Sequence, residues 1–196
     1  MSGIQEELAG LRAQVRSDRR TVVAPLVVFG VLVLANSAVM LLGGAAARHV
    51  SALLYWPVAG AIGLGVLWAY ARRVASRDGV GEGPRSYRPV TLGYLVSLPV
   101  LALLFLPAFF VGVFGPLAWP GAILAAIGFR QRSTTLKRVA KWLAFGGAVQ
   151  LLLVMISTAA GEAVAVAALG LGPLAGLTML AAAFVLVRRA PRPADA

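Results

Sequence analysis

The sequence contains no cysteine and only one histidine, His49. Without cysteine there can be no disulfides, no thiolate metal ligands and no cysteine nucleophile. Acidic residues are also scarce: there are seven, and Glu162 is the only one outside the basic segments. The chain has no carboxylate pair within an apolar run and no GxSxG, HExxH or Walker motif. We therefore predict a non-enzymatic protein with no catalytic residue, no metal site and no cofactor.

Apolar residues are what the chain has in abundance. They make up 60% of it, charged residues make up 13%, and the mean hydropathy is +0.86. Soluble domains are about 45–50% apolar and about 25% charged. Six apolar runs approach the roughly 20 residues that a helix needs to cross a bilayer. We predict an all-α fold, a polytopic membrane helix bundle with six transmembrane helices: Val22–Leu42, Ala52–Ala71, Val90–Val111, Pro116–Phe129, Trp142–Ala160 and Ala165–Val187.

The positive charges indicate the orientation of these spans. Seventeen of the 18 Lys and Arg residues fall in four short patches, at 12–20, 72–88, 130–141 and 188–192, and Arg48 is the exception. Short basic loops resist translocation, and an even number of spans puts all four patches on one side. We expect a multi-pass protein of the cell membrane with both termini in the cytoplasm. The abundance of Ala, Gly and Arg also favours a bacterial source with a GC-rich genome.

The net charge of +11 bears on the partners. The basic residues border apolar runs, where the headgroups of anionic lipids attract them. The expected partners are therefore the lipid bilayer and its anionic headgroups. Nucleic acid is not expected, because the chain has no basic domain to bind it.

The fourth predicted span is the least regular. Pro116–Phe129 has 14 residues, and prolines crowd the turn before it. Segment 105–129 therefore has a second interpretation, a re-entrant pair that never reaches the outer surface, which satisfies the same charge pattern. Tyr and Trp prefer membrane interfaces, so we expect Trp56 and Trp119 at the outer surface and Trp142 at the inner one.

Residues 1–20 differ from the rest of the chain. Ile4, Leu8, Leu11 and Val15 are spaced to line one face of a helix. We predict three parts: a cytoplasmic amphipathic helix at 1–20, a transmembrane domain at 21–187 and a basic cytoplasmic tail at 188–196. The short helix either lies on the membrane surface or packs on a partner.

A few polar residues lie within or between the spans. Gln150 falls near the middle of span five, and Asn36 and Ser37 fall in the outer half of span one. Each can line a polar cavity, or it can form an interhelical contact, which we favour because hydrocarbon offers no other partner. His49 and Glu162 form a possible pair on the outer face, where they could relay protons or hold a cation. The simpler interpretation is two loop residues facing water.

Helix-breaking residues and small residues also recur. Pro99 and Pro107 interrupt span three, and a Gly170–Pro173 segment interrupts span six. Paired broken helices are typical of inverted-repeat transporters, but ordinary kinks explain them as well. Small-residue pairs such as Gly172 with Gly176 favour close helix packing.

Two functions fit these observations. The first is an accessory or regulatory subunit that engages a cytoplasmic partner, such as a transport ATPase or a signalling protein, through residues 1–20 and the basic loops. The second is a small transporter or substrate-binding transport component. In size and topology alone, the chain is similar to the substrate-binding components of energy-coupling-factor vitamin transporters. A homo-oligomer is compatible with either function.

Overall fold

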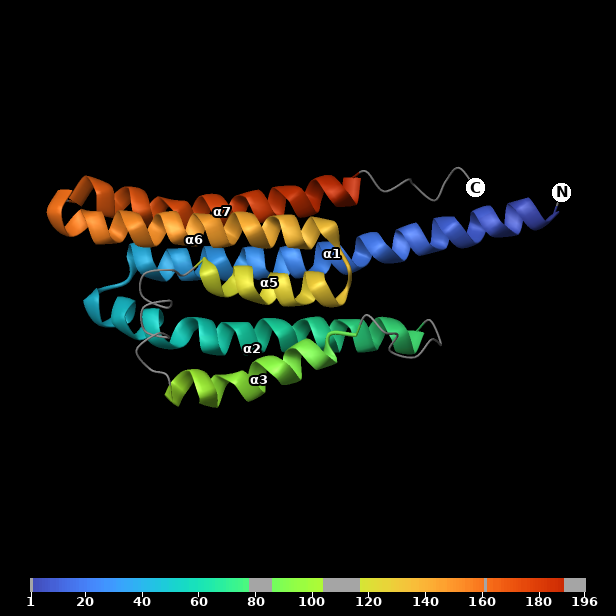
Figure 1. Ribbon diagram of the computed structural model, residues 1–196, viewed down its shortest axis with the longest axis horizontal. Coiled ribbons are helices and arrows are strands. Elements are labelled where there is room, and N and C mark those ends of the chain that lie inside the picture. Colours follow the sequence, from blue (N-terminus) through green and yellow to red (C-terminus); the bar gives the residue numbers. More distant parts are fainter. Residues whose placement is uncertain (1, 78–85, 104–116, 161, 189–196) are drawn as a thin grey trace.

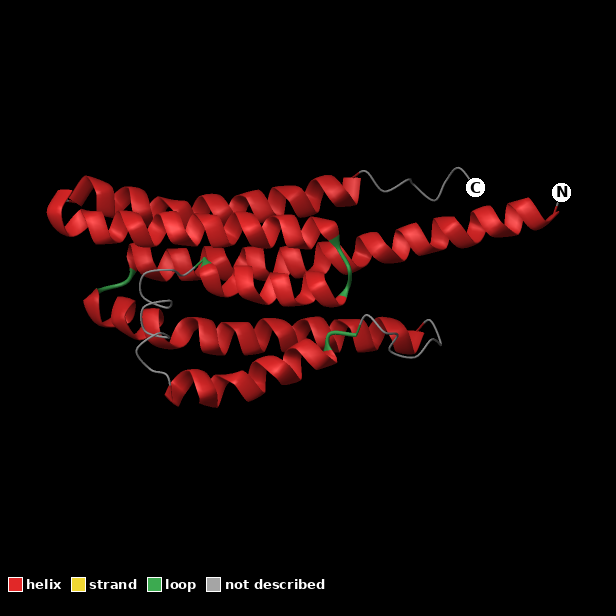
Figure 2. Cartoon of the chain, in the orientation of Figure 1, coloured by secondary structure: helices red, strands yellow, loops and turns green. Residues whose placement is uncertain are grey.

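The computed structural model describes residues 2–77, 86–103, 117–160 and 162–188, and all regular structure within them is helical (Figures 1 and 2). The predicted all-α class is confirmed. Six helices are present among these residues: α1 (Ser2–Leu42), α2 (Ala45–Arg77), α3 (Arg88–Leu103), α5 (Ala118–Arg130), α6 (Thr134–Ala160) and α7 (Glu162–Arg188).

Four of these helices are long and apolar enough to cross a membrane. The qualifying segments are Val22–Leu42, Leu54–Ser76, Thr134–Ile156 and Ala168–Arg188. The α3 and α5 helices have 16 and 13 residues, fewer than the roughly 20 that a crossing requires. Predicted spans three and four run into residues 104–116, which lie outside the described residues.

The α1 helix joins two segments that the sequence analysis had separated. Residues 2–20 and the first apolar run form one continuous helix of 41 residues. The junction is Arg19-Arg20-Thr21-Val22, which contains no glycine or proline to end a helix. Pro25 lies inside the helix, one turn further on. The first half of α1 consequently extends beyond the ends of the other described helices (Figure 1).

The loop between α1 and α2 is shorter than the apolar runs indicated. We expected loop structure between the first two runs, but α2 already begins at Ala45. The sequence there is Ala45-Ala46-Ala47, and alanine has the highest helix propensity of all residues. One consequence concerns Trp56, expected at the outer surface. It lies inside α2 and is 1% exposed, so it packs between helices, and its expected depth in the membrane stays a prediction.

The α5 helix does not reach the end of the bundle. Ala118, its first residue, packs against Gly147 near the middle of α6, so that a Cβ at Gly147 would lie 3.0 Å from the Ala118 nitrogen. Trp119, expected at an outer turn, is instead 8% exposed and makes an edge-to-face contact with Tyr94. Burial between helices does not report depth in a membrane, so the expected outer position of Trp119 stays a prediction.

The helices pack as a bundle in which α1 contacts α7 most extensively, α6 lies between α5 and α7, and α2 contacts α1 and α3. Many large apolar side chains nevertheless face outward, including Val58, Ile62, Phe145, Leu177 and Phe184. A soluble monomer rarely exposes so much contiguous apolar surface, whereas lipid covers it in a membrane. The fully buried core residues include Leu26, Phe29, Trp56, Leu64, Leu67, Leu124, Ile127 and Leu136.

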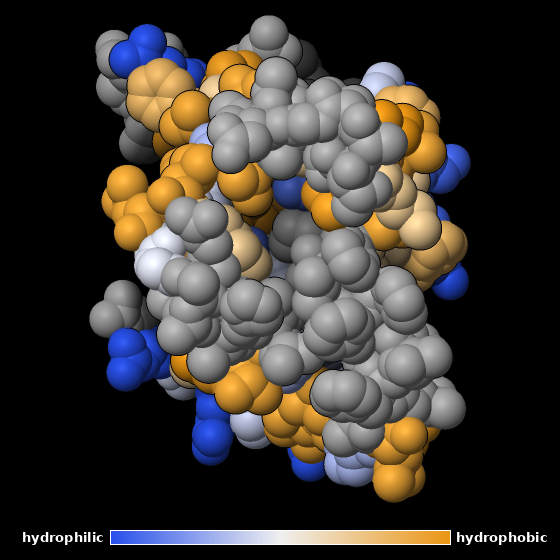
Figure 3. Space-filling view, turned by 90° about the vertical axis from the view of Figure 1, so that its left-hand side faces the viewer, coloured by the Kyte–Doolittle hydropathy of each residue, from blue (hydrophilic) through white to orange (hydrophobic). Residues whose placement is uncertain are grey.

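The positive charges gather at one end of this bundle, called here the basic end. The projecting half of α1, the α2 and α5 C-termini, the α3 and α6 N-termini and the α7 C-terminus all lie there (Figure 1). The sequence prediction that four separate patches share one side agrees with this geometry. Seen from the opposite end, described surface residues are mostly hydrophobic, with hydrophilic side chains at the margins (Figure 3). The described basic residues of this end are Arg72, Arg73, Arg88, Arg130, Arg132, Lys137, Arg138, Lys141 and Arg188.

Candidate functional site

Gln150 forms a hydrogen bond between two helices. Its Nε2 donates to the carbonyl of Ala168 on α7 at 3.0 Å, and the side chain is 4% exposed. The next carbonyl along α7 belongs to Leu169, and it lacks its usual helical donor because Pro173 has no N–H. Gln150 therefore contacts α7 at the turn where Pro173 removes a backbone hydrogen bond of that helix. Its Oε1 is buried and has no hydrogen-bond partner among the described residues.

Ser37 marks a close approach between α1 and α7. Its Oγ donates to the Val33 carbonyl within α1 at 2.7 Å, and a Cβ at Gly172 would come within 2.5 Å of that Oγ. One turn along, a Cβ at Gly176 would lie 2.7 Å from Leu34 Cγ. The small-residue pair Gly172 and Gly176 thus lets the two helices approach closely, as the sequence predicted.

Two of the three polar residues predicted within the spans therefore contact neighbouring turns of α7. Gln150 bonds to Ala168, and Ser37 contacts Gly172 one turn further on. Asn36 is 5% exposed and also makes a polar or electrostatic contact. Of the two interpretations offered for these residues, helix-to-helix contact has direct support for Gln150 and Ser37.

His49 and Glu162 lie in helices rather than in loops. His49 is in the first turns of α2, and Glu162 is the first residue of α7. Both helix starts are at the end opposite the basic end (Figure 1). Their side chains lie outside the described residues, so their pairing stays a prediction. Among the described residues, no group of three or more His, Cys, Asp or Glu side chains is placed to hold a metal.

Two tyrosines tie the helices together in a way the sequence did not indicate. The Tyr55 hydroxyl donates to the Leu32 carbonyl on α1 at 2.6 Å. The Tyr94 hydroxyl donates to the Trp56 carbonyl on α2 at 2.8 Å and fills the space beside Gly60. Buried tyrosines usually find such a partner, but their acceptors depend on helix rotation, which hydropathy does not report.

At the basic end, Tyr87 and Gln131 are buried beside each other. Their exposed fractions are 4% and 6%. Burial raises the pKa of the Tyr87 hydroxyl, and the neighbouring Gln131 side chain acts in the opposite direction. The amide of Gln131 has no hydrogen-bond partner within 3.5 Å among the described residues. Gln131 follows α5 at a tight turn, where Arg132 adopts a φ of 54°.

The apolar stripe of residues 1–20 has a counterpart in the bundle core. Leu8, Leu11 and Val15 each precede a core residue by eighteen positions, which is five turns at 3.6 residues per turn. The counterparts, Leu26, Phe29 and Val33, are 0%, 0% and 1% exposed. Ile4 bears the same relation to Val22, which packs against the core. Because α1 is one continuous helix, the stripe and the core residues occupy the same helical face.

This shared face defines the candidate site, which lies over the basic end of the bundle. Below Val22 the face is buried against the other helices. Above it, α1 continues beyond them (Figure 1). The basic residues of the neighbouring helix ends lie beneath. The candidate site thus combines the projecting half of α1 with the basic residues of the neighbouring helix ends, called here the cationic floor.

No protein-family model matches this sequence, and no curated protein or solved structure shows significant similarity to it.

Proposed function

We propose that this chain is a non-enzymatic accessory or regulatory membrane subunit that engages a cytoplasmic protein at its basic end. In this proposal the bundle lies in the cell membrane of a bacterium. Six segments enter the bilayer, and both termini are in the cytoplasm. The four apolar helices and the clustering of basic helix ends support that orientation, because short Lys- and Arg-rich segments stay inside.

The five-turn register between the stripe and the core carries the proposal. A stripe pointing away from the bundle would serve a helix of a neighbouring molecule at the side. We infer instead that the stripe faces the space over the basic end, because it shares its helical register with the core residues of α1. A partner seated there would contact the stripe and the basic residues together.

The chemistry of the two surfaces indicates what kind of partner fits. An amphipathic helix binds in an apolar groove through residues that recur every three or four positions. The stripe residues Ile4, Leu8, Leu11 and Val15 have this spacing. The arginines and lysines of the basic end favour a partner with acidic residues around that groove. Opposite charges of this kind also speed the association of the two proteins. A transport ATPase or a signalling protein with such a groove fits this description.

Affinity purification from native membranes tests the proposal. Full-length protein is compared with a variant lacking residues 2–15, which keeps Arg16, Arg19 and Arg20 and hence the basic flank that orients α1. Mass spectrometry should identify a cytoplasmic protein that is recovered with the full-length chain and lost with the truncated one. Equal recovery from both would remove the role proposed for the stripe.

The alternative function, a small transporter or substrate-binding transport component, is favoured by one observation. Gln150 Oε1 is buried without a hydrogen-bond partner among the described residues, and a solute that entered between α6 and α7 would find an unused acceptor there. A carrier should lose uptake or binding when Gln150 becomes Leu, with expression unchanged. The identified partner of the truncation experiment discriminates between the two functions.

A further inference from the structure

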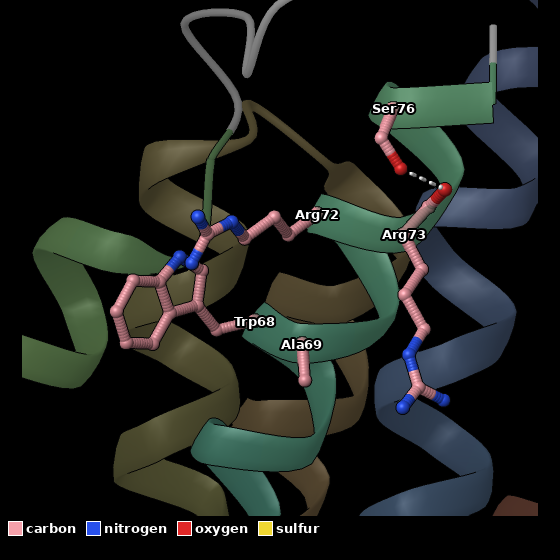
Figure 4. A pocket seen from close by; sticks show the side chains of 5 residues that line it. All are labelled: Trp68, Ala69, Arg72, Arg73 and Ser76. Atoms are coloured by element: carbon pink, nitrogen blue, oxygen red, sulfur yellow. Dashed lines mark hydrogen bonds between the residues drawn. The ribbon is translucent and has the colours of Figure 1, made fainter.

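A pocket lies on α2 where the apolar segment Leu54–Ser76 ends at the basic end. It has a volume of about 350 Å³ and is lined by Trp68, Ala69, Arg72, Arg73 and Ser76. Figure 4 shows the Arg72 side chain turned toward the indole of Trp68 and the Arg73 side chain on the other side of Ala69. Two guanidinium groups therefore flank a space that the small Ala69 side chain leaves open.

The charges of this pocket suit an anion. Both arginines are exposed. The C-terminus of α2 contributes about half a negative charge from its dipole, which two full positive charges outweigh. Guanidinium groups bind phosphate oxygens through paired N–H donors. The Ser76 hydroxyl donates to the Arg73 carbonyl at 2.9 Å (Figure 4).

An apolar track continues from the pocket along the same helix. Val66, Ile62 and Val58 lie at successive turns below Ala69 and are 51%, 58% and 54% exposed. Gly65 lies beside them, and a Cβ there would meet no atom within 4 Å. This track runs toward the middle of the membrane-spanning segment, where acyl chains lie. A free phosphate ion would use the arginines but not the track.

We propose that this pocket binds the phosphodiester headgroup of an anionic phospholipid, with an acyl chain lying along Val58, Ile62 and Val66. Arg72 and Arg73 hold the phosphate oxygens from either side of Ala69. Trp68 contacts the glycerol region, as tryptophans do at membrane interfaces. The site is specific in place, in contrast to the diffuse attraction of basic loops for an anionic membrane, and it does not depend on the cytoplasmic partner proposed above.

The test uses the purified full-length protein in detergent, with bound lipid counted by native mass spectrometry. Phosphatidylglycerol, phosphatidylcholine and inorganic phosphate are the probes. The variant R72Q/R73Q removes both cations of the pocket. The matched control, R138Q/K141Q, removes the same charge from two positions of α6 at the same end. A third variant, A69L, keeps the charge and fills the space between the arginines.

Phosphatidylglycerol should bind the wild-type protein in preference to phosphatidylcholine. Losing both pocket arginines should weaken the binding of phosphatidylglycerol about 30-fold, because each cation close to an anionic lipid surface contributes to the binding free energy. The α6 control should bind as the wild type does, and A69L should bind weakly despite its unchanged charge. Equal losses in R72Q/R73Q and the control would show diffuse attraction and overturn the proposal. Displacement of the lipid by equimolar inorganic phosphate would overturn it too, since the ligand would then be a free anion.

Discussion

Gln150 Nε2 lies 3.0 Å from the carbonyl oxygen of Ala168, joining the middle of α6 to α7 one turn before the contact between Ser37 and Gly172. Gln150 therefore bonds α6 to α7, whereas Ser37, whose Oγ donates within α1, lies against Gly172 on the next turn of α7. The contrast between this packing role and a solute-binding role can be measured directly.

Replacing Gln150 with Leu should change stability only modestly. The variant loses an interhelical hydrogen bond, worth about 0.6–2 kcal/mol in membranes, but it also removes the buried Oε1 that has no partner among the described residues. The two effects oppose each other, so the Tm in detergent should shift by less than about 4 °C. Circular dichroism melting measures this. A large loss of uptake in cells at unchanged Tm would instead favour the transporter.

The close approach of α1 and α7 should make Gly172 intolerant of side chains. A leucine there must displace the Ser37 hydroxyl, because even a Cβ comes within 2.5 Å of it. Overpacking of this kind costs about 1–3 kcal/mol, and we expect Gly172→Leu to lower the Tm by roughly 3–10 °C. Gly170→Leu is the matched control, since a Cβ at Gly170 meets nothing within 4 Å. Similar melting of both variants would show that α1 and α7 do not pack this closely.

Tyr87 should make the stability of the folded protein depend on pH in the alkaline range. Burial raises the pKa of its hydroxyl above the ordinary value of 10.0, so the folded state disfavours the ionised form. The contribution of Tyr87 is therefore fully present below about pH 10 and is lost as the pH rises toward its folded pKa. The difference in Tm between wild type and Tyr87→Phe should shrink or reverse above about pH 10, because other groups titrate equally in both proteins. A difference that stays constant as the pH rises from neutral through that range would contradict the burial of this hydroxyl.

The proposed orientation predicts which single cysteines react in intact cells. The native chain has no cysteine, so each introduced thiol is reported alone. Gly44, exposed between α1 and α2 at the end opposite the basic end, should react as cysteine with an impermeant reagent added outside. Ser133, between α5 and α6 at the basic end, should react only after permeabilisation. Labelling of Ser133→Cys in intact cells would invert the orientation.

Much of the fold could be predicted from the sequence because bilayer thickness constrains helix length. Apolar runs predicted the four long helices, and the spacing of arginines placed their basic ends together. Hydropathy does not determine how deep a residue lies in the membrane or how its helix is rotated about its axis. For this reason the burial of Trp56 and Trp119 between helices could not be predicted. The acceptors of Tyr55 and Tyr94 depend on rotation in the same way.

The candidate site was only half visible in the sequence. The stripe at Leu8 and Leu11 was evident from its spacing, but it was assigned to a separate short helix. Its five-turn relation to Leu26 and Phe29 becomes meaningful only when α1 is continuous. A comparison of the two apolar patterns at a separation of eighteen residues could have revealed it. The basic residues of the cationic floor come together only when several helices pack, and the sequence of a single helix does not predict that packing.

Capture of the cytoplasmic partner by two matched variants tests the central claim most directly. Leu8→Asp/Leu11→Asp places two charges on the stripe, and Ala9→Asp/Ala13→Asp places the same charges on the opposite face of α1. Each variant is purified from native membranes, and the partner identified with the wild type is quantified. Partner recovery should fall at least about tenfold for the stripe variant, since burying an unpaired carboxylate costs more than about 1.4 kcal/mol, and stay near the wild-type level for the other. Equal recovery from the two variants would contradict a partner held by the stripe over the basic end.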